Sequence, residues 1–178
     1  MKSLQQYHIP YTGLKPGKHH FEFEVDGRFF DAFEYSLVKS GELKVELEMD
    51  KQETMLILNF QITGNISLTC DLCLAGFPLK IEITERQLVK FSNDSNLEDD
   101  TEEIVVLNKN EHEIDVSTLI YEYITLAVPY VNRCEDEGNT RWCDREMIEK
   151  LNSFAAEKEE ENDLADPRWE ALKKIKKN

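Results

Sequence analysis

The sequence predicts an α+β fold, with an antiparallel, partly barrel-like β-sheet in the N-terminal two thirds and helices packed on it toward the C-terminus. Between residues 21 and 91, several segments alternate apolar and polar side chains with the period of two that half-buried strands show. From residue 114 onward, apolar residues recur at the spacing of amphipathic helices instead. The expected organisation is a leading segment (1–20), a single α+β domain (21–156), an acidic linker (157–165), and a short C-terminal helix with a basic tail (166–178).

The strands are expected in the following order. Residues 21–25 alternate apolar and acidic side chains, and Asp26-Gly27 is a tight-turn signal, so these residues and 28–30 are expected to form a hairpin. A short helix over 31–38 is the alternative. Gly64-Asn65 indicates a bulge or bend within a long strand. The remaining strands are predicted at 42–49, 54–70, 77–89 and 104–107.

Helices are expected in the last third of the chain. Asp115 is a plausible N-cap for a helix that ends before Pro129, and a second helix is predicted over 144–156. Asp166 followed by Pro167, with Glu170 in the first turn, indicates the start of the last helix. Between sheet and helices, residues 92–103 carry six acids and no Lys or Arg, which predicts a mobile acidic loop.

The charge of the chain narrows the classes of function. Its 178 residues contain 21 Lys and Arg against 36 Asp and Glu, giving a formal net charge of −15. Autonomous binding to a nucleic-acid backbone requires clustered cationic charge, so this class is not expected. The sequence has no secretory apolar core near its start and no apolar run of about 20 residues, which predicts a soluble cytoplasmic protein without a membrane partner.

Four cysteines are the candidate metal ligands. Cys70 and Cys73 are separated by two residues, the spacing that lets two thiols bind one tetrahedral metal. Cys134 and Cys143 form a second, wider pair with eight residues between them. The hypothesis is a structural zinc held by all four; the alternative is a strand-end turn with unremarkable thiols. A thioredoxin-like redox site is disfavoured, because that motif lies at a helix N-terminus and here strands flank it.

No motif for nucleophilic catalysis, phosphate binding or a metalloprotease occurs in the sequence, so an enzyme is not expected.

Trp and Arg are enriched at interface hot spots, and lysines near the C-terminus add a local basic patch. Packing of each Trp against the sheet as an anchor is the alternative. The partner-contact candidates are Arg141, Trp142, Arg168, Trp169, Lys173 and Lys174.

Several elements together resemble a known family. Residues 64–74 read Gly-Asn-Ile-Ser-Leu-Thr-Cys-Asp-Leu-Cys-Leu, residues 114–116 open a helix ending Leu-Ala-Val-Pro at 126–129, and residues 166–172 read Asp-Pro-Arg-Trp-Glu-Ala-Leu. This order resembles the bacterial YceD family, the large ribosomal RNA subunit accumulation proteins, over residues 20–177. The chain departs from the family pattern at Leu72, where relatives often carry Arg, and in its stretched second cysteine pair.

The resemblance implies a non-enzymatic ribosome-biogenesis factor that supports the synthesis, processing or stability of 23S rRNA in large-subunit assembly. The expected partner is a large-subunit precursor, through a ribosomal protein or an assembly factor, with direct rRNA contact left open. An acidic protein would attract the basic proteins of such a particle, and complementary charge accelerates encounter. The alternative is a zinc-containing protein with an enzymatic or generic acidic binding role unrelated to ribosomes.

Overall fold

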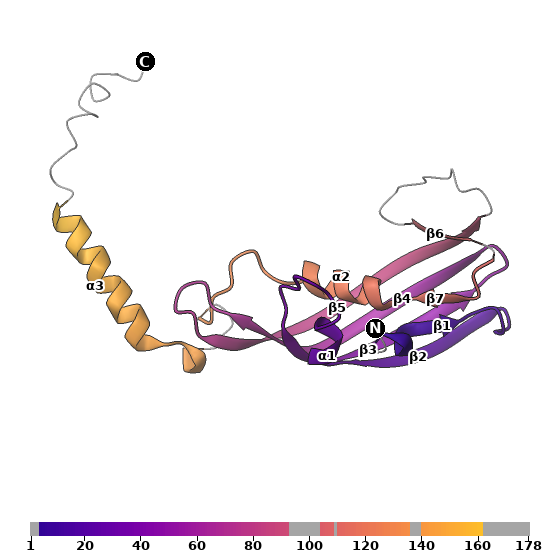
Figure 1. The fold of residues 1–178 in the computed structure, drawn as a ribbon, viewed down its shortest axis with the longest axis horizontal. Coiled ribbons are helices and arrows are strands. Elements are labelled where there is room, and N and C mark those ends of the chain that lie inside the picture. Colours follow the sequence, from indigo (N-terminus) through magenta and orange to yellow (C-terminus); the bar gives the residue numbers. More distant parts are fainter. Residues whose placement is uncertain (1–3, 93–103, 109, 136–139, 162–178) are drawn as a thin grey trace, which may run out of the picture.

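A computed structural model describes residues 4–92, 104–108, 110–135 and 140–161. It shows a long sheet with short elements on one face and a helix that leaves one end (Figure 1). In chain order the elements are η1 (Gln5–Tyr7), β1 (His8–Pro10), β2 (Gly17–Val25), α1 (Gly27–Phe30), β3 (Ser40–Lys51), β4 (Met55–Thr69), β5 (Gly76–Ser92), β6 (Ile104–Asn108), β7 (Glu113–Asp115), α2 (Ser117–Leu126), η2 (Thr140–Trp142) and α3 (Arg145–Glu161).

The main sheet has the strand order β2-β3-β4-β5-β6. Neighbours are antiparallel from β2 to β5, whereas β6 runs parallel to β5. The α+β class is therefore confirmed, and the sheet is open, with β2 and β6 at its borders, and does not close into a barrel. The direction of β6 could not be read from the sequence, because side chains alternate with the same period in parallel and antiparallel strands.

One face of the sheet carries the core. The alternating apolar residues of β3 are buried, as predicted for 42–49, and those of β4 are buried on the same face. Helix α2 contributes Ile120 and Ile124, both fully buried, and Phe60 of β4 packs edge-on against Tyr123 at 5.4 Å between ring centroids. The buried residues of β3 and β4 are Leu43, Val45, Leu47, Met49, Leu56, Leu58, Phe60, Ile62, Ile66 and Leu68.

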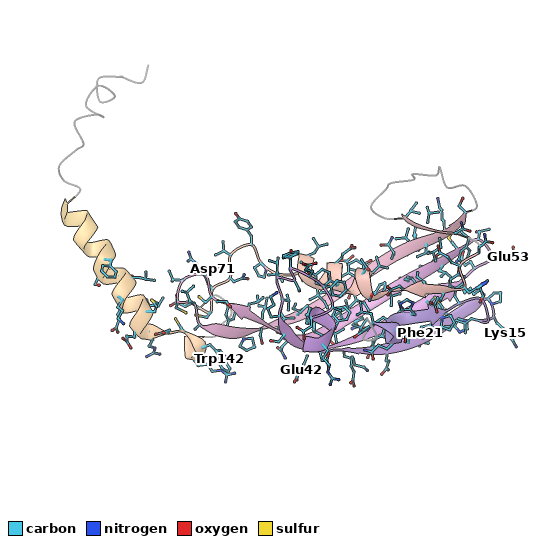
Figure 2. The ribbon with its side chains drawn as sticks, viewed as in Figure 1. Lys15, Phe21, Glu42, Glu53, Asp71 and Trp142 are labelled. Carbon is cyan, nitrogen blue, oxygen red and sulfur yellow. The ribbon has the colours of Figure 1, made fainter. Side chains whose placement is uncertain are left out.

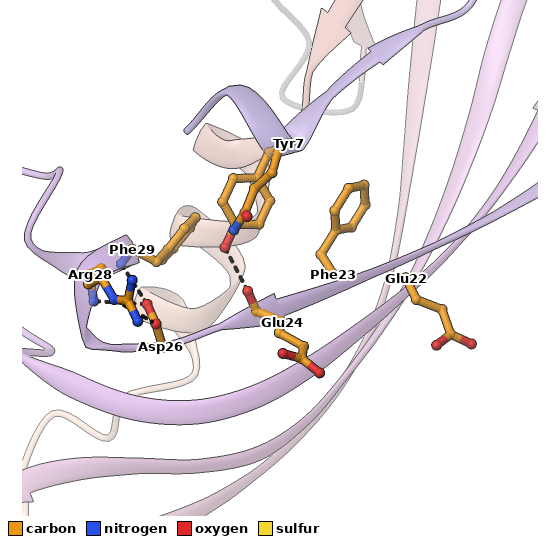
Figure 3. Close-up of a pocket in the computed structure, with 8 residues that line it drawn as sticks. Tyr7, Glu22, Phe23, Glu24, Asp26, Arg28 and Phe29 are labelled. Atoms are coloured by element: carbon orange, nitrogen blue, oxygen red, sulfur yellow. Dashed lines mark hydrogen bonds and ion pairs between the residues drawn. The ribbon is translucent and has the colours of Figure 1, made fainter. Parts of the chain in front are cut away.

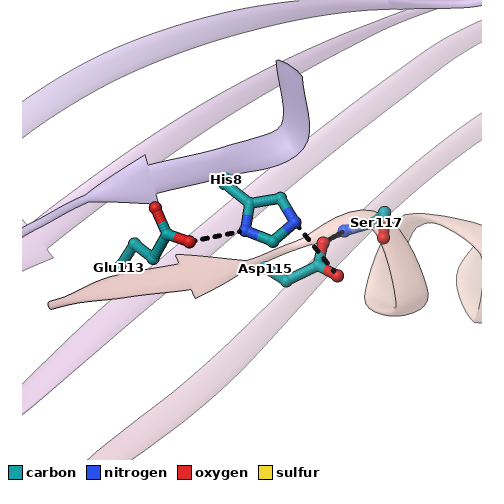
Figure 4. A network of polar contacts seen from close by, with 4 residues as sticks. All are labelled: His8, Glu113, Asp115 and Ser117. Atoms are coloured by element: carbon teal, nitrogen blue, oxygen red, sulfur yellow. Dashed lines mark hydrogen bonds and ion pairs between the residues drawn. The ribbon is translucent and has the colours of Figure 1, made fainter. Parts of the chain in front are cut away.

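The segment expected to lead into the domain is part of its structure. Strand β1 pairs with β7, about a hundred residues later in the chain, and Tyr7, Ile9 and Tyr11 are buried. Around this pairing His8 Nδ1 lies 3.1 Å from Glu113 Oε1, and its Nε2 lies 3.6 Å from Asp115 Oδ2 (Figure 4). A strand of three residues is too short for an alternating apolar pattern to be recognised in the sequence.

Two helix starts differ from their predictions. The expected hairpin at Asp26 is wrong, as is the alternative helix over 31–38: the Asp26 carboxylate instead caps α1, accepting from Arg28 N at 2.9 Å and Phe29 N at 3.3 Å (Figure 3). The short helix buries the side chain of Phe29 in the core, which favours it over an exposed hairpin. Helix α2 begins one residue later than predicted, with Val116 at the N-cap, while Asp115 Oδ1 accepts from Ser117 N at 2.8 Å.

Helix α3 extends away from the sheet (Figure 1). It starts at Arg145, one residue after the predicted start, and Asp144 Oδ1 accepts from Met147 N at 3.1 Å. Met147 in its first turn contacts the core, whereas Leu151 and Phe154 are 39% and 62% exposed. Helix α2 packs on the sheet, whereas α3 contacts the buried core only through residues near its beginning. It continues to Glu161, into the range predicted as an acidic linker; residues 93–103 of the acidic loop and 162–178 lie outside the described residues.

Lys51 at the end of β3 forms hydrogen bonds with the loop that follows β1. Its Nζ donates to the carbonyl oxygens of Tyr11 at 2.7 Å and Leu14 at 2.8 Å. We expect Lys51→Met to lower the free energy of unfolding by about 2 kcal/mol in a urea titration, because charge-assisted bonds to two carbonyls are lost. Lys18→Met is the matched control: its ammonium pairs with Glu48 on the exposed face, so a much smaller change is expected. Equal losses in the two variants would contradict this role of Lys51.

Candidate metal centre

The turn between β4 and β5 holds the first two thiols. Cys70 N donates to Ala75 O at 2.9 Å and Leu74 N donates to Cys70 O at 3.0 Å, while Leu74 takes a left-handed φ of 61°. Inside this closed turn Cys73 N donates to Cys70 Sγ at 3.5 Å. Both cysteine side chains are buried. The two-residue spacing thus directs both sulfur atoms toward the same interior point.

A clamp between Asp71 and Asn132 brings the third thiol to this turn. Asp71 N donates to Asn132 O at 2.8 Å, and Asn132 N donates to Asp71 Oδ2 at 2.7 Å. Cys134 follows two residues later, and its Sγ lies 3.7 Å from Cys73 Sγ. The sulfur atoms of Cys70, Cys73 and Cys134 all lie within 4.8 Å of one another, and none of these cysteines forms a disulfide.

Cys143 stands beside this group as a fourth, half-buried thiol. It interacts with the thiols of Cys134 and Cys73, and its Sγ lies 3.9 Å from Glu135 Oε1. Trp142, next to it, lies at the same end of the molecule as Asp71 (Figure 2). The tertiary structure therefore gathers all four cysteines of the chain at one site, although 60 residues separate Cys73 from Cys134.

The environment of each thiol is different. Burial by itself raises the pKa of Cys70, but backbone N–H groups of Cys73, Cys134 and Leu72 point at its sulfur and hold the pKa at about 7. Burial is also the main reason why the pKa of Cys134 is raised, and the adjoining thiols raise it further. Contact with Cys134 acts to lower the pKa of Cys143, yet burial and the neighbouring Cys73 leave it raised. Of these three thiols, Cys70 is the one whose surroundings favour the thiolate.

The distance between two of the sulfur atoms matches that expected around a tetrahedral metal. Zinc–sulfur bonds of about 2.3 Å place two sulfur atoms of a tetrahedron about 3.8 Å apart, close to the 3.7 Å between Cys73 and Cys134. Zinc is well matched to thiolate ligands, and the metal replaces the protons of the thiols. Four cysteine ligands would leave no open coordination position for a substrate, which is the arrangement of structural zinc sites.

The predicted partner-contact residues separate into two groups. Arg141 and Trp142 lie in η2 beside the cysteines, with the guanidinium carbon of Arg141 5.1 Å from the centroid of the Trp142 ring. Trp142 is 42% exposed and so does not serve as a buried anchor. Arg168, Trp169, Lys173 and Lys174 lie outside the described residues. The Asp71–Asn132 clamp was not anticipated, since nothing in the sequence relates two polar residues so far apart.

Comparisons with known proteins give one family and one relative. Residues 58–176 match the family model described as "Large ribosomal RNA subunit accumulation protein YceD". The chain is 26% identical over 162 residues to "Uncharacterized protein YlbN" of Bacillus subtilis (strain 168), a match that covers 90% of each protein. No solved structure matches the chain. The family match includes all four cysteines.

Proposed function

Because the chain belongs to the YceD family of large ribosomal RNA subunit accumulation proteins, we propose that it is a non-enzymatic ribosome-biogenesis factor. It supports the synthesis, processing or stability of 23S rRNA during assembly of the large subunit. The family match over residues 58–176 is the observation that carries this proposal. The cysteine cluster supports it indirectly, because four thiolates around one metal stabilise a fold and leave no position for a substrate.

The proposed mode of action is contact with proteins of the large-subunit precursor in the cytoplasm. A net charge of −15 favours a basic ribosomal protein or an assembly factor over the phosphate backbone of rRNA. None of the described helices is long and apolar enough to cross a bilayer. Arg141 and Trp142 offer an exposed contact point beside the cysteines, of the residue types that dominate interface energetics.

The proposed cofactor is one structural zinc ion held by Cys70, Cys73, Cys134 and Cys143. Bound there, it would join the β4–β5 turn to the segment that leads into α3. Among the described residues, the Asp71–Asn132 clamp supplies the backbone hydrogen bonds between these two segments. Zinc would thus fix the end of the sheet from which α3 and its exposed apolar residues extend.

The function is tested by the ratio of 23S to 16S rRNA in cells depleted of the protein. We expect the ratio to fall selectively on depletion and to return on expression of the wild-type chain, with precursor particles accumulating in sucrose gradients. Control cells carry the same depletion system and an unrelated rescue protein. An unchanged ratio, with depletion verified by immunoblot, would contradict the proposed function.

A further inference from the structure

Helix α3 carries an apolar stripe that the core covers only at its start. Met147 and Ile148 are half-buried and pack against the core, whereas Leu151 and Phe154 are exposed. The three- and four-residue steps between them place all four on one side of the helix. Beyond its first turn α3 projects away from the sheet (Figure 1), so the described part of the chain leaves the outer half of the stripe uncovered.

The length of α3 favours a second apolar surface along this stripe. A helix that stands alone in water is only marginally stable, because most helical stability in proteins comes from packing of an apolar face. Helix α3 has 17 residues, and only residues near its beginning contact the core. A helix or strand that covered Leu151 and Phe154 would supply the missing packing.

The chain that follows α3 has the sequence of such a covering helix. Residues 162–178 lie outside the described residues, and within them the sequence predicts a helix that begins at Asp166. Trp169, Leu172 and Ile175 recur every three residues, which keeps them on one side of a helix over two turns. The predicted helix thus has an apolar side of its own.

Chain length lets this apolar side reach the exposed stripe. Four residues, 162–165, separate Glu161 from Asp166, and connections of about two to eight residues commonly join antiparallel helices. From Leu151 to Glu161 α3 rises about 15 Å, and a helix from Asp166 to Ile175 would rise about 14 Å. A helix that reversed direction after α3 would therefore extend back to Leu151.

Charge favours the same occupant over a second α3. Helix α3 contains six Glu against three Arg and Lys, a side-chain charge of −3. The C-terminal segment, defined here as residues 166–177, contains five Arg and Lys against two acids, a side-chain charge of +3. Packing of two α3 helices would bring like charges together, whereas the C-terminal segment brings opposite charge. The short link also gives it an effective concentration of about millimolar, which a second chain lacks.

We propose that the C-terminal segment folds back on α3 as an antiparallel helix, with its apolar side covering Leu151 and Phe154. In this arrangement Trp169 anchors the segment to its own chain. Lys174 comes two residues after Leu172 in the helix, so it faces away from α3 and remains available to a partner. The arrangement involves only the chain itself, and it therefore stands independently of the proposed function.

Photo-cross-linking in the full-length protein tests this contact. A benzophenone derivative of phenylalanine replaces Phe154 in an equal mixture of unlabelled and isotope-labelled chains, and mass spectrometry identifies the cross-linked peptides. We expect cross-links to residues 168–176 within chains of one isotopic form. The same group at Ser153, on the opposite side of the helix from Leu151, should not form them. Cross-links between the two isotopic forms, or none from position 154 to the C-terminal segment, would overturn the proposal.

Fluorescence of Trp169 measures how far the segment is docked. Trp142→Phe leaves Trp169 as the one tryptophan of the chain, and we expect acrylamide to quench it less than free tryptophan. Adding Leu151→Ser/Phe154→Ser should shift the docking equilibrium at least about tenfold, because two apolar contacts are lost. Quenching should then approach that of free tryptophan.

A matched variant and dilution make the fluorescence result specific. Leu126→Ser/Tyr130→Ser likewise removes one exposed leucine and one exposed aromatic residue, at and after the end of α2, and quenching of Trp169 should not change. Dilution by about a hundredfold should also leave quenching unchanged, because the contact lies within one chain. Equal effects of the two double variants, or release of Trp169 on dilution, would contradict the proposal.

A change in the C-terminal segment keeps the proposal falsifiable if the α3 variant fails to fold. Leu172→Ser/Ile175→Ser leaves every described residue unchanged, and we expect it to raise the quenching of Trp169 as the α3 variant does. Lys174→Ser is the control on the outward side of the segment and should leave quenching low. Low quenching retained in Leu172→Ser/Ile175→Ser would show that Trp169 is covered by something other than the proposed contact and would overturn it.

Discussion

Replacing Cys73 by serine is expected to abolish zinc binding and to destabilise the cysteine end of the protein. Cys73 Sγ lies 3.7 Å from Cys134 Sγ and belongs to the buried three-thiol group, so its loss opens the proposed tetrahedral site. Structural zinc contributes directly to folding free energy. We expect the zinc content to fall from one ion per chain to none, and the melting temperature to fall by about 10 °C, the shift that about 4 kcal/mol gives at this chain length.

Two variants make this result specific to the metal. Leu72→Ser alters the same turn at an exposed residue and keeps every thiol, so zinc and melting temperature should stay near the wild-type values. Cys143→Ser tests the half-buried fourth ligand, and zinc content should again fall. Loss of zinc from Cys73→Ser with an unchanged melting temperature would contradict a structural role, and a wild-type protein purified without zinc that gains no stability from added zinc would contradict the site.

The second large effect is expected at Gly64, where β3 and β4 come unusually close. Gly64 has a φ of 151°, and a Cβ atom there would lie 2.2 Å from Glu42 O and 2.6 Å from Leu43 Cα. Both obstacles are backbone atoms of the paired strand, so no side chain can move aside. We expect Gly64→Ala to lower the free energy of unfolding by about 3 kcal/mol or more, measured by urea titration, because the strands must separate or the backbone must change conformation.

Gly13→Ala is the matched control for this substitution. No atom lies within 4 Å of the Cβ position at Gly13, so its stability should stay within about 1 kcal/mol of the wild type. A similar small effect at Gly64 would show that the contact with β3 relaxes easily, contrary to this expectation. The sequence indicates a bulge or bend at Gly64-Asn65; the pairing of β4 continues without an extra residue on either side, so the glycine serves close backbone approach instead.

Local pattern was enough to predict the long strands and the two described helices of the C-terminal third. In β3 the alternation of Leu43, Val45, Leu47 and Met49 reports which face is buried, because burial of one face of a strand requires a period of two. The start of α3 was predicted to within one residue, and the structure adds that Asp144 accepts from Met147 N in its first turn. The same reasoning failed at Asp26, since a residue that favours turns also caps helices, and burial of Phe29 decides between them.

The cysteine site shows how far sequence reasoning extends. The spacing of Cys70 and Cys73 identifies a pair that can share a metal, because two residues between thiols suit one tight turn. The wider pair, Cys134 and Cys143, carries no such local signal. The tertiary structure places Cys134 against the first pair, where the clamp between Asp71 and Asn132 holds the two segments together.

By itself, the sequence determined the fold class, the long strands, the acidic character of the protein and the residues able to bind a metal. Each of these depends on local spacing or on composition. The tertiary structure decided the pairing of β1 with β7, the parallel direction of β6, the gathering of the four cysteines and the position of β2 at the sheet border. These features depend on how segments are arranged in space, and the contacts that set this arrangement leave no periodic trace in either segment alone.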